Sequence, residues 1–373
     1  MKDYLFSGNR IFFRIVFLSL FLNCRTSDGQ ILQDTSTITL IRKGIKCIYS
    51  IRLNEAEDIL NSLNEKYPGH PATYLYKGIM IYYRNYPLLA SSPERKSLEY
   101  QLKTSIRLCE TQDNWIDDPE KLLIDLSSRG LLLLFYNENG LSSDVIPIVL
   151  TSYKGIRKSF QFTSVYPDFS YFTGLYNYYR EVYPEHHAVY RAVALLFPPG
   201  DSHKGLAELA YCAENAIVLK AEAYSVLSWI NQYYEKNYSL ALECSKTLND
   251  LYPSNLLFRG EYIKVLVLLK KYDEAELLIS SSANDDNRYF QGQLDVFNGL
   301  IQEKKYHNYE MAESFYRKGV NIMEQFGSRG KEYKLYGSKG LKRLKDLKSG
   351  KQVSRKKRDR DSQDVDVDLL EFN

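Results

Sequence analysis

Residues 238–253 read YSLALECSKTLNDLYP, a run in which the small residue Ala241 lies twelve positions before Pro253. The same spacing from a small residue to the proline of a Tyr-Pro dipeptide occurs twice more. The two further pairs are Ala56 with Pro68 and Gly155 with Pro167. Ala241 itself recurs 34 residues later as Ala275. One helix–turn–helix unit takes a period of this length, so the spacing predicts a chain of repeated helical hairpins.

The chain around this stretch, from about residue 31 to 348, is divided by prolines and glycines into segments of helical length. The first pair of helices is expected over Thr35–Tyr49 and Asn54–Lys66, with Asn54 as the N-cap. Pro71 is expected in the first turn of the next helix, where its missing N–H is not needed. The last helix is expected over Lys331–Leu347. The sequence thus predicts an all-α fold without a β-sheet.

The order of small, aromatic and proline residues resembles the tetratricopeptide (TPR) pattern. Small residues let the two helices of a hairpin touch, and the proline ends the second helix. The matching positions are Leu40, Gly44, Ala56, Leu60 and Pro68 in one unit, Tyr74 and Gly78 in the next, and Ala241, Leu248 and Pro253 later. The resemblance covers about 36–84, 221–283 and 287–326. It implies a right-handed superhelical solenoid of TPR-like hairpins, with longer and irregular hairpins between these parts.

The irregular middle is also similar to uncharacterised bacterial exported TPR proteins and lipoproteins. The stretches that carry this second resemblance are Gly174-Leu-Tyr-Asn-Tyr178-Tyr179, Phe197-Pro-Pro-Gly-Asp201 and Lys204-Gly205-Leu206. The resemblance supplies a family and no activity. We expect the second stretch to be a fixed loop in which Gly200 adopts a positive φ. A connector between helices accounts for such a loop as well as a functional role does.

The first residues have the composition of an export signal. Three basic residues precede the apolar run 15–22, which is too short to span a bilayer but suits a signal peptide. Cys24 follows the run by two positions, where bacterial lipoproteins are cleaved and acylated, so we expect lipidation at Cys24. Cleavage within 25–30, which gives a soluble exported protein, is the alternative. The expected location is therefore an outer-membrane lipoprotein or the periplasm.

The C-terminal residues carry blocks of charge with few apolar side chains. A basic run, Arg355-Lys-Lys-Arg-Asp-Arg360, precedes several acidic residues, and such a composition cannot bury enough surface to fold. We expect the following divisions: signal peptide 1–23, tether 24–34, TPR-like hairpins 35–84, irregular hairpins 85–220, TPR repeats with a capping helix 221–348, and a disordered charged tail 349–373.

Three Tyr-Tyr pairs recur at one spacing. Each begins four residues after a conspicuous residue: Tyr82 and Tyr83 after Gly78, Tyr178 and Tyr179 after Gly174, Tyr233 and Tyr234 after Trp229. The TPR resemblance places these pairs late on the first helices of hairpins, which line the concave groove where peptides bind. All six tyrosines are therefore candidate partner-binding residues, which would stack on an extended chain and hydrogen-bond to it. Packing of one tyrosine per pair in the core is the alternative.

Composition and motifs give no sign of catalysis. A net charge of +3 from 49 basic and 46 acidic residues does not indicate a nucleic-acid partner. The cysteines Cys47, Cys109, Cys212 and Cys244 lack zinc spacing and are expected to be buried thiols. The histidines form no metal-binding or catalytic motif, and we expect no cofactor. The leading hypothesis is a non-catalytic scaffold that binds a protein or peptide in the bacterial envelope. The alternative is an enzyme with a site in the irregular segment 155–215.

Overall fold

The computed structural model describes residues 31–111, 113–186 and 197–349, and the regular structure of these residues is entirely helical. The predicted all-α class is confirmed for them. The expected signal peptide, Cys24 and the charged tail beyond residue 349 lie outside the described residues. The helices run in this order: η1 (Ile31–Gln33), α2 (Thr35–Tyr49), α3 (Leu53–Lys66), α4 (Pro71–Arg84), α5 (Arg95–Cys109), η2 (Trp115–Asp117), α6 (Pro119–Glu138), α7 (Ser142–Ser159), α8 (Phe169–His186), α10 (Ser202–Asn215), α11 (Lys220–Tyr233), α12 (Tyr238–Leu251), α13 (Leu256–Leu268), α14 (Tyr272–Ser281), α15 (Arg288–Lys304), α16 (Tyr309–Glu324) and α17 (Gly327–Lys348).

The first three helices begin and end close to the positions that the sequence predicts. Pro71 opens α4 as expected, and the His70 imidazole caps that helix by accepting from the backbone N–H of Ala72. The N-cap of α3 is Arg52 and not Asn54, which is a correction. The backbone N–H of Ala56 already donates to the carbonyl of Arg52, at 3.1 Å, so the helix begins before Asn54.

Small residues lie where helices of a hairpin touch. The repeated alanines Ala56, Ala241 and Ala275 are completely buried. A Cβ added at Gly44 in α2 would come within 2.3 Å of the Tyr76 hydroxyl in α4, and one at Gly78 within 2.5 Å of Leu102. The small residues therefore allow close approach of helices, which is the physical reason for the repeated spacing.

Two expectations need correction: the backbone conformation of Gly200 and the start of the last helix. Gly200 does not have a positive φ; a Cβ there would instead lie 2.3 Å from the Asn177 carbonyl oxygen, so close approach requires the glycine. The last helix begins at Gly327 rather than Lys331. At Gly330 a Cβ would lie 2.0 Å from the Met323 carbonyl oxygen, so this glycine allows the tight turn between α16 and α17.

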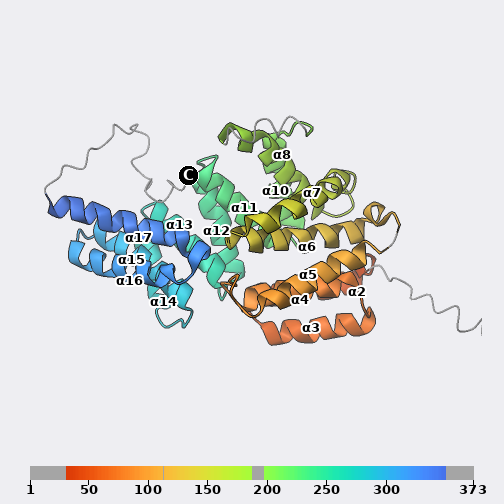
Figure 1. The fold of residues 1–373 in the computed structure, drawn as a ribbon, viewed down its shortest axis with the longest axis horizontal. Coiled ribbons are helices and arrows are strands. Elements are labelled where there is room, and N and C mark those ends of the chain that lie inside the picture. Colours follow the sequence, from red (N-terminus) through yellow and green to blue (C-terminus); the bar gives the residue numbers. More distant parts are fainter. Residues whose placement is uncertain (1–30, 112, 187–196, 350–373) are drawn as a thin grey trace, which may run out of the picture.

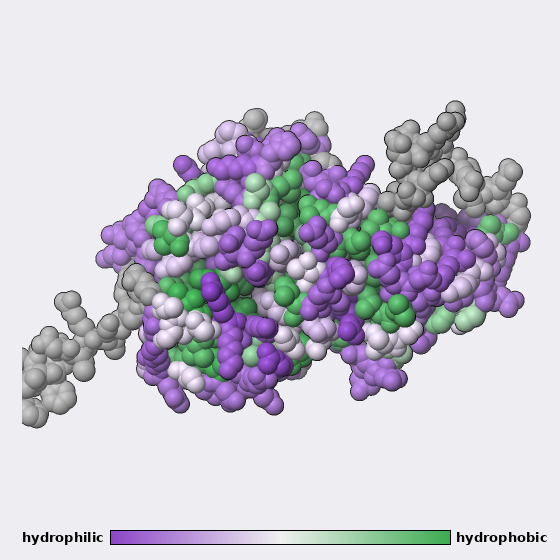
Figure 2. Space-filling model, turned by 180° about the vertical axis from the view of Figure 1, so that it is seen from behind, coloured by the Kyte–Doolittle hydropathy of each residue, from purple (hydrophilic) through white to green (hydrophobic). Residues whose placement is uncertain are grey.

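Consecutive helices lie beside one another along the molecule, with α2–α6 at one end of the long axis, α13–α17 at the other and α10–α12 between them (Figure 1). Two apolar cores follow this division. One spans buried residues from Ile31 to Phe258, and the other spans Tyr262 to Leu344. Seen from behind, hydrophobic residues reach the surface over the N-terminal helices and near the centre, whereas hydrophilic residues dominate the C-terminal end (Figure 2).

The chain also folds back on itself through contacts between distant helices. The ring of Tyr49, at the end of α2, packs 5.3 Å from Tyr252 and 5.9 Å from Phe258, measured between centroids. The Asn255 amide donates to the Tyr49 carbonyl, and the Asn287 amide donates to the Tyr86 carbonyl. In an open array of repeats each unit contacts only its neighbours. These contacts go further, because they join the first hairpins to helices about 200 residues later.

The thiols of Cys47, Cys109, Cys212 and Cys244 are free and buried, as predicted. Among the described residues, no helix is both long and apolar enough to cross a membrane.

Candidate binding surface

Two of the three tyrosine pairs lie at the ends of helices, as the repeat pattern predicts, and the remaining pair lies in the middle of its helix. Tyr82 and Tyr83 lie near the end of α4, and Tyr178 and Tyr179 lie in α8. Tyr233 ends α11, and Tyr234 is its C-cap. The pairs differ, however, in what covers them.

The first pair is closed. The side chains of Tyr82 and Tyr83 are only 2% and 8% exposed. The Tyr82 hydroxyl donates to Glu138 Oε2 at 2.7 Å, and the Tyr83 ring packs edge-on against Tyr49 at 4.9 Å. Burial raises the pKa of both phenols well above its usual value, so the hydroxyls remain proton donors. The expectation that this pair presents its rings to a partner is therefore wrong, because other helices already occupy that side.

An ion pair between a buried arginine and a partly exposed glutamate closes the same region from the C-terminal side. The Arg329 guanidinium, at the start of α17, forms an ion pair with Glu138 at the end of α6. It also lies 5.7 Å from the centroid of the Tyr86 ring, and the Tyr86 ring packs edge-on against Tyr289 at 5.6 Å. This junction joins the last helix of the second core to the loop and helix ends of the first.

The second pair is divided between the core and the surface. Tyr178 is fully buried, and its hydroxyl donates to Glu235 Oε1 at 2.6 Å, so it too has no free face for a partner. Tyr179 is half-buried. Its ring lies 6.2 Å from Tyr234 and 6.5 Å from Trp229. Only one member of this pair is accessible, which matches the alternative of one core tyrosine per pair.

The third pair belongs to an aromatic surface centred on Trp229. The indole is 41% exposed, and its ring lies 5.2 Å from Tyr233 and 5.3 Å from Tyr234. We call Tyr179, Trp229, Tyr233 and Tyr234 the Trp229 cluster. The tyrosines of the cluster are half-buried, so α8 and α11 present four rings that lie together at the surface. Aromatic rings grouped in this way supply a large contact area at low entropic cost.

Charged residues of α13 and α17 hold one edge of the Trp229 cluster. The Tyr233 hydroxyl donates to Glu332 Oε1 at 3.1 Å. The buried Lys264 ammonium lies 2.8 Å from Glu261 Oε2 and 3.4 Å from Glu332 Oε1. Burial opposes the charge on Lys264, but the two carboxylates outweigh it and raise the pKa of the ammonium. The cluster is therefore fixed in place by the second core and is not a loose surface patch.

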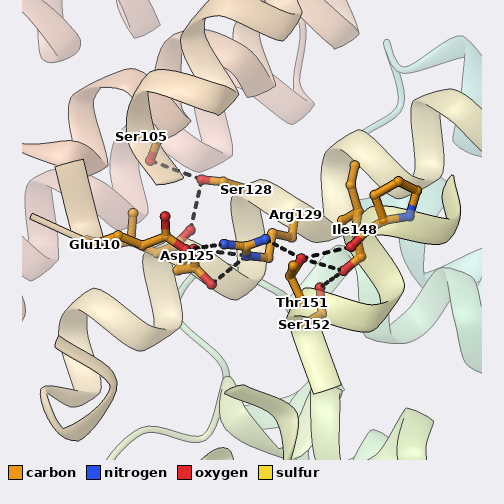
Figure 3. A network of polar contacts seen from close by, with 10 residues as sticks. Ser105, Glu110, Asp125, Ser128, Arg129, Ile148, Thr151 and Ser152 are labelled. Carbon is orange, nitrogen blue, oxygen red and sulfur yellow. Dashed lines mark hydrogen bonds and ion pairs between the residues drawn. The ribbon is translucent and has the colours of Figure 1, made fainter. Parts of the chain in front are cut away.

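The most elaborate polar network in the irregular middle joins three helices (Figure 3). The Arg129 guanidinium in α6 donates through Nε to both oxygens of Asp125, at 2.8 and 3.0 Å. Its other nitrogens donate to Thr151 in α7 and to Glu110 at the end of α5. Burial raises the pKa of Asp125 to about 6, although Arg129 opposes the shift. Arg129 thus contacts side chains from three consecutive α-helices, so the network clamps α5, α6 and α7 together.

The segment 155–215 contains one buried carboxylate whose role is structural. Asp168 is completely buried and accepts the backbone N–H groups of Ile217, Val218 and Leu219 at 2.8–2.9 Å. It thereby ties the start of α8 to the loop before α11. Asp201 caps α10, because its Oδ1 accepts the backbone N–H of Lys204. Among the described residues, no group of three or more His, Cys, Asp or Glu side chains is arranged to hold a metal ion.

An apolar cavity of about 40 Å³ lies under the point where the described chain begins. Its walls come from η1, α2, α4 and α6, and include Ile31, Ile41 and Leu123. Glu120 lies at its edge, where the carboxylate accepts the backbone N–H groups of Ile31 and Leu32. The cavity is smaller than the few hundred Å³ that ligand pockets occupy, so it is a packing defect beside a structural clamp.

Sequence reasoning found the tyrosines but missed Trp229 as a member of the surface. A signal existed, because residues four apart lie on one face of a helix and Trp229 precedes Tyr233 by four. No family model matches this chain, and no curated protein or solved structure matches it. The candidate surface is therefore defined by its own geometry.

Proposed function

We propose that this chain is an exported, non-catalytic scaffold of TPR-like hairpins, arranged as a right-handed superhelical solenoid, that binds a protein or peptide partner in the bacterial envelope. The Trp229 cluster carries the proposal. It is a fixed group of aromatic rings at the surface, and its central indole is 41% exposed. Large, partly exposed aromatic groups on helical scaffolds are suited to extended peptides, which stack on the rings and hydrogen-bond to the phenols.

The partner-binding role is tested by selecting peptides from a random display library against the full chain and measuring their affinities by titration calorimetry. Trp229→Ala should weaken the selected peptides by at least about tenfold, as expected for an aromatic residue at the centre of an interface. Tyr100→Ala is the matched control, because Tyr100 is an exposed aromatic residue of α5, with 63% exposure, outside the cluster. Equal affinities for wild type and Trp229→Ala would reject the surface, and equal losses in both variants would show non-specific binding.

The export part of the proposal is carried by the sequence before residue 31. An apolar run followed by Cys24 supports cleavage and acylation at that cysteine. An acylated cysteine buries several times as many methylene groups as a single myristoyl chain, which anchors only marginally. The protein should then partition into a detergent phase, and Cys24→Ala should move it to the aqueous phase or block maturation. An intact mass with an unmodified N-terminus between Arg25 and Leu32 would contradict lipidation.

A further inference from the structure

Positive charge is concentrated in the last helix. In α17, eight of 22 residues are basic and two are acidic, a balance of +6. The whole chain has a net charge of only +3. The remainder of the chain is therefore slightly acidic, and its charge is distributed unevenly.

Two of the basic residues of α17 face the fold. The buried Arg329 forms the ion pair with Glu138. Arg343 donates to both oxygens of Glu303 in α15, at 2.7 and 2.8 Å. Between them the helix packs buried residues such as Tyr336 and Leu344 against the second core. This side of α17 accounts for the stability of the terminal helix and leaves its opposite side for other contacts.

The opposite side carries a stripe of lysines. Lys331, Lys342 and Lys345 are exposed, and none of the three forms an ion pair with an acidic side chain of the described residues. At about 100° per residue they lie within a sector of roughly 60°, and at about 1.5 Å per residue they extend over roughly 20 Å. We call these three residues the lysine stripe. Lys334 and Lys348 flank it and are each paired with a glutamate of α16, at 2.6 Å.

No carboxylate of the described residues pairs with the ammonium groups of the stripe. A row of unpaired ammonium groups on one straight helix presents point charges to a flat anionic surface, and each lysine near such a surface strengthens binding. The chain continues beyond α17 with a short basic run, Arg355–Arg358, which is followed by six acidic residues, so the net positive charge of this end of the chain belongs to α17. A partner whose charge is complementary to the lysine stripe would therefore present an extended array of anionic groups.

We propose that the lysine stripe of α17 binds the anionic phospholipid headgroups of a membrane and acts as a second attachment point. The choice of a membrane as the anionic surface rests on the proposed export and acylation at Cys24. The two attachments lie far apart, because the described chain begins beside α2, at one end of the long axis, and α17 lies at the other end (Figure 1). Together they would hold the long axis along the membrane. One acyl-type anchor combined with a basic patch gives firmer attachment than either alone.

The proposal is tested by vesicle flotation of the full chain carrying Cys24→Ala, so that no acyl chain contributes. Binding to vesicles of phosphatidylglycerol and phosphatidylcholine should exceed binding to pure phosphatidylcholine, and the excess should fall as salt is added. Any contribution of the apolar N-terminal run appears on both kinds of vesicle and cancels in the comparison. Removing the stripe by Lys331→Gln, Lys342→Gln and Lys345→Gln should lower the excess by about fivefold per lysine, or about 100-fold in all.

The matched control removes three exposed lysines elsewhere, by Lys96→Gln, Lys154→Gln and Lys236→Gln. Its binding to anionic vesicles should stay close to that of the parent chain, and both triple variants should melt like the parent because all six side chains are exposed. Unchanged binding in the stripe variant, or an equal loss in the two variants, would overturn the proposal. So would stronger binding of the stripe to soluble polyglutamate than to anionic vesicles. The outcome is independent of the partner-binding test, since Trp229→Ala leaves the stripe intact.

Discussion

The first and third tyrosine pairs share a sequence pattern and a place on their helices, yet one is closed and the other lies at the surface. Tyr82 donates its hydroxyl to Glu138 and is covered by the junction at Arg329. Tyr233 and Tyr234 are half-buried beside the exposed Trp229. The difference teaches that a local repeat places a side chain on a helix face, while contacts between distant parts of the chain decide whether that face remains accessible.

The cause of the difference is the way in which the chain folds back. The ends of α4 and α6 meet α13 and α17, so residues about 175–250 positions later cover the first pair. The third pair lies on α11, between the two cores, and α13 and α17 contact it along one edge through Lys264 and Glu332. One set of later helices therefore covers the first pair and only supports the third.

The largest expected effect comes from breaking the junction that closes the first pair. Arg329→Met should leave the partly exposed Glu138 carboxylate with the Tyr82 hydroxyl but with no cation beside it, and should lower the free energy of unfolding by about 3 kcal/mol. The matched control is Arg317→Met, which removes an exposed partner of Glu313 and should cost less than about 1 kcal/mol. Urea unfolding measures both. Similar losses in the two variants would mean that Arg329 does not close the structure.

An intermediate effect is expected where repeated small residues pack. Ala241→Leu or Ala275→Leu should lower the free energy of unfolding by about 1–3 kcal/mol, because each alanine is completely buried at a helix contact. Ser239→Leu, at an exposed position of α12, should change it little. Melting temperatures equal to wild type in both alanine variants would show that the wrong face of the hairpins has been assigned to the core.

A pH-dependent effect is expected at the contact between α2 and α11. The Tyr49 hydroxyl donates to the Glu222 carboxyl group, and burial raises the pKa of Glu222 from 4.5 to about 7. The folded state therefore holds this proton more tightly than the unfolded state does. The contribution of Glu222 to stability is full below about pH 4.5 and is lost as the pH rises through 7.

The pH effect is measured as the difference between wild type and Glu222→Gln in urea unfolding from pH 4.5 to 8. The glutamine cannot ionise, so the wild type should lose stability relative to the variant as the pH rises across this window. A constant difference between the two proteins would show that Glu222 titrates at its ordinary value, and that its environment is more open than the structure indicates.

Much of the local structure follows from the sequence, and the exposure of the candidate site does not. The bounds of α2, the first-turn position of Pro71 and the buried thiols depend on short-range patterns. The reason for a glycine at positions 200 and 330 does not follow from the local sequence, because carbonyl groups of neighbouring helices leave no room there for a Cβ. The closure of Tyr82 depends on Arg329, and no local pattern links residues so far apart. The role of Trp229 depended on the same long-range arrangement.

The central claim is that the first tyrosine pair is buried and that the third is accessible. Hydroxyl-radical footprinting of the folded chain, read by mass spectrometry, tests this claim most directly. Unfolded protein supplies the intrinsic oxidation rate of each residue. The account predicts fast oxidation at Trp229, intermediate rates at Tyr233 and Tyr234, and strong protection of Tyr82 and Tyr83. Equal protection of both pairs, or oxidation of Tyr82 as fast as that of Trp229, would contradict it.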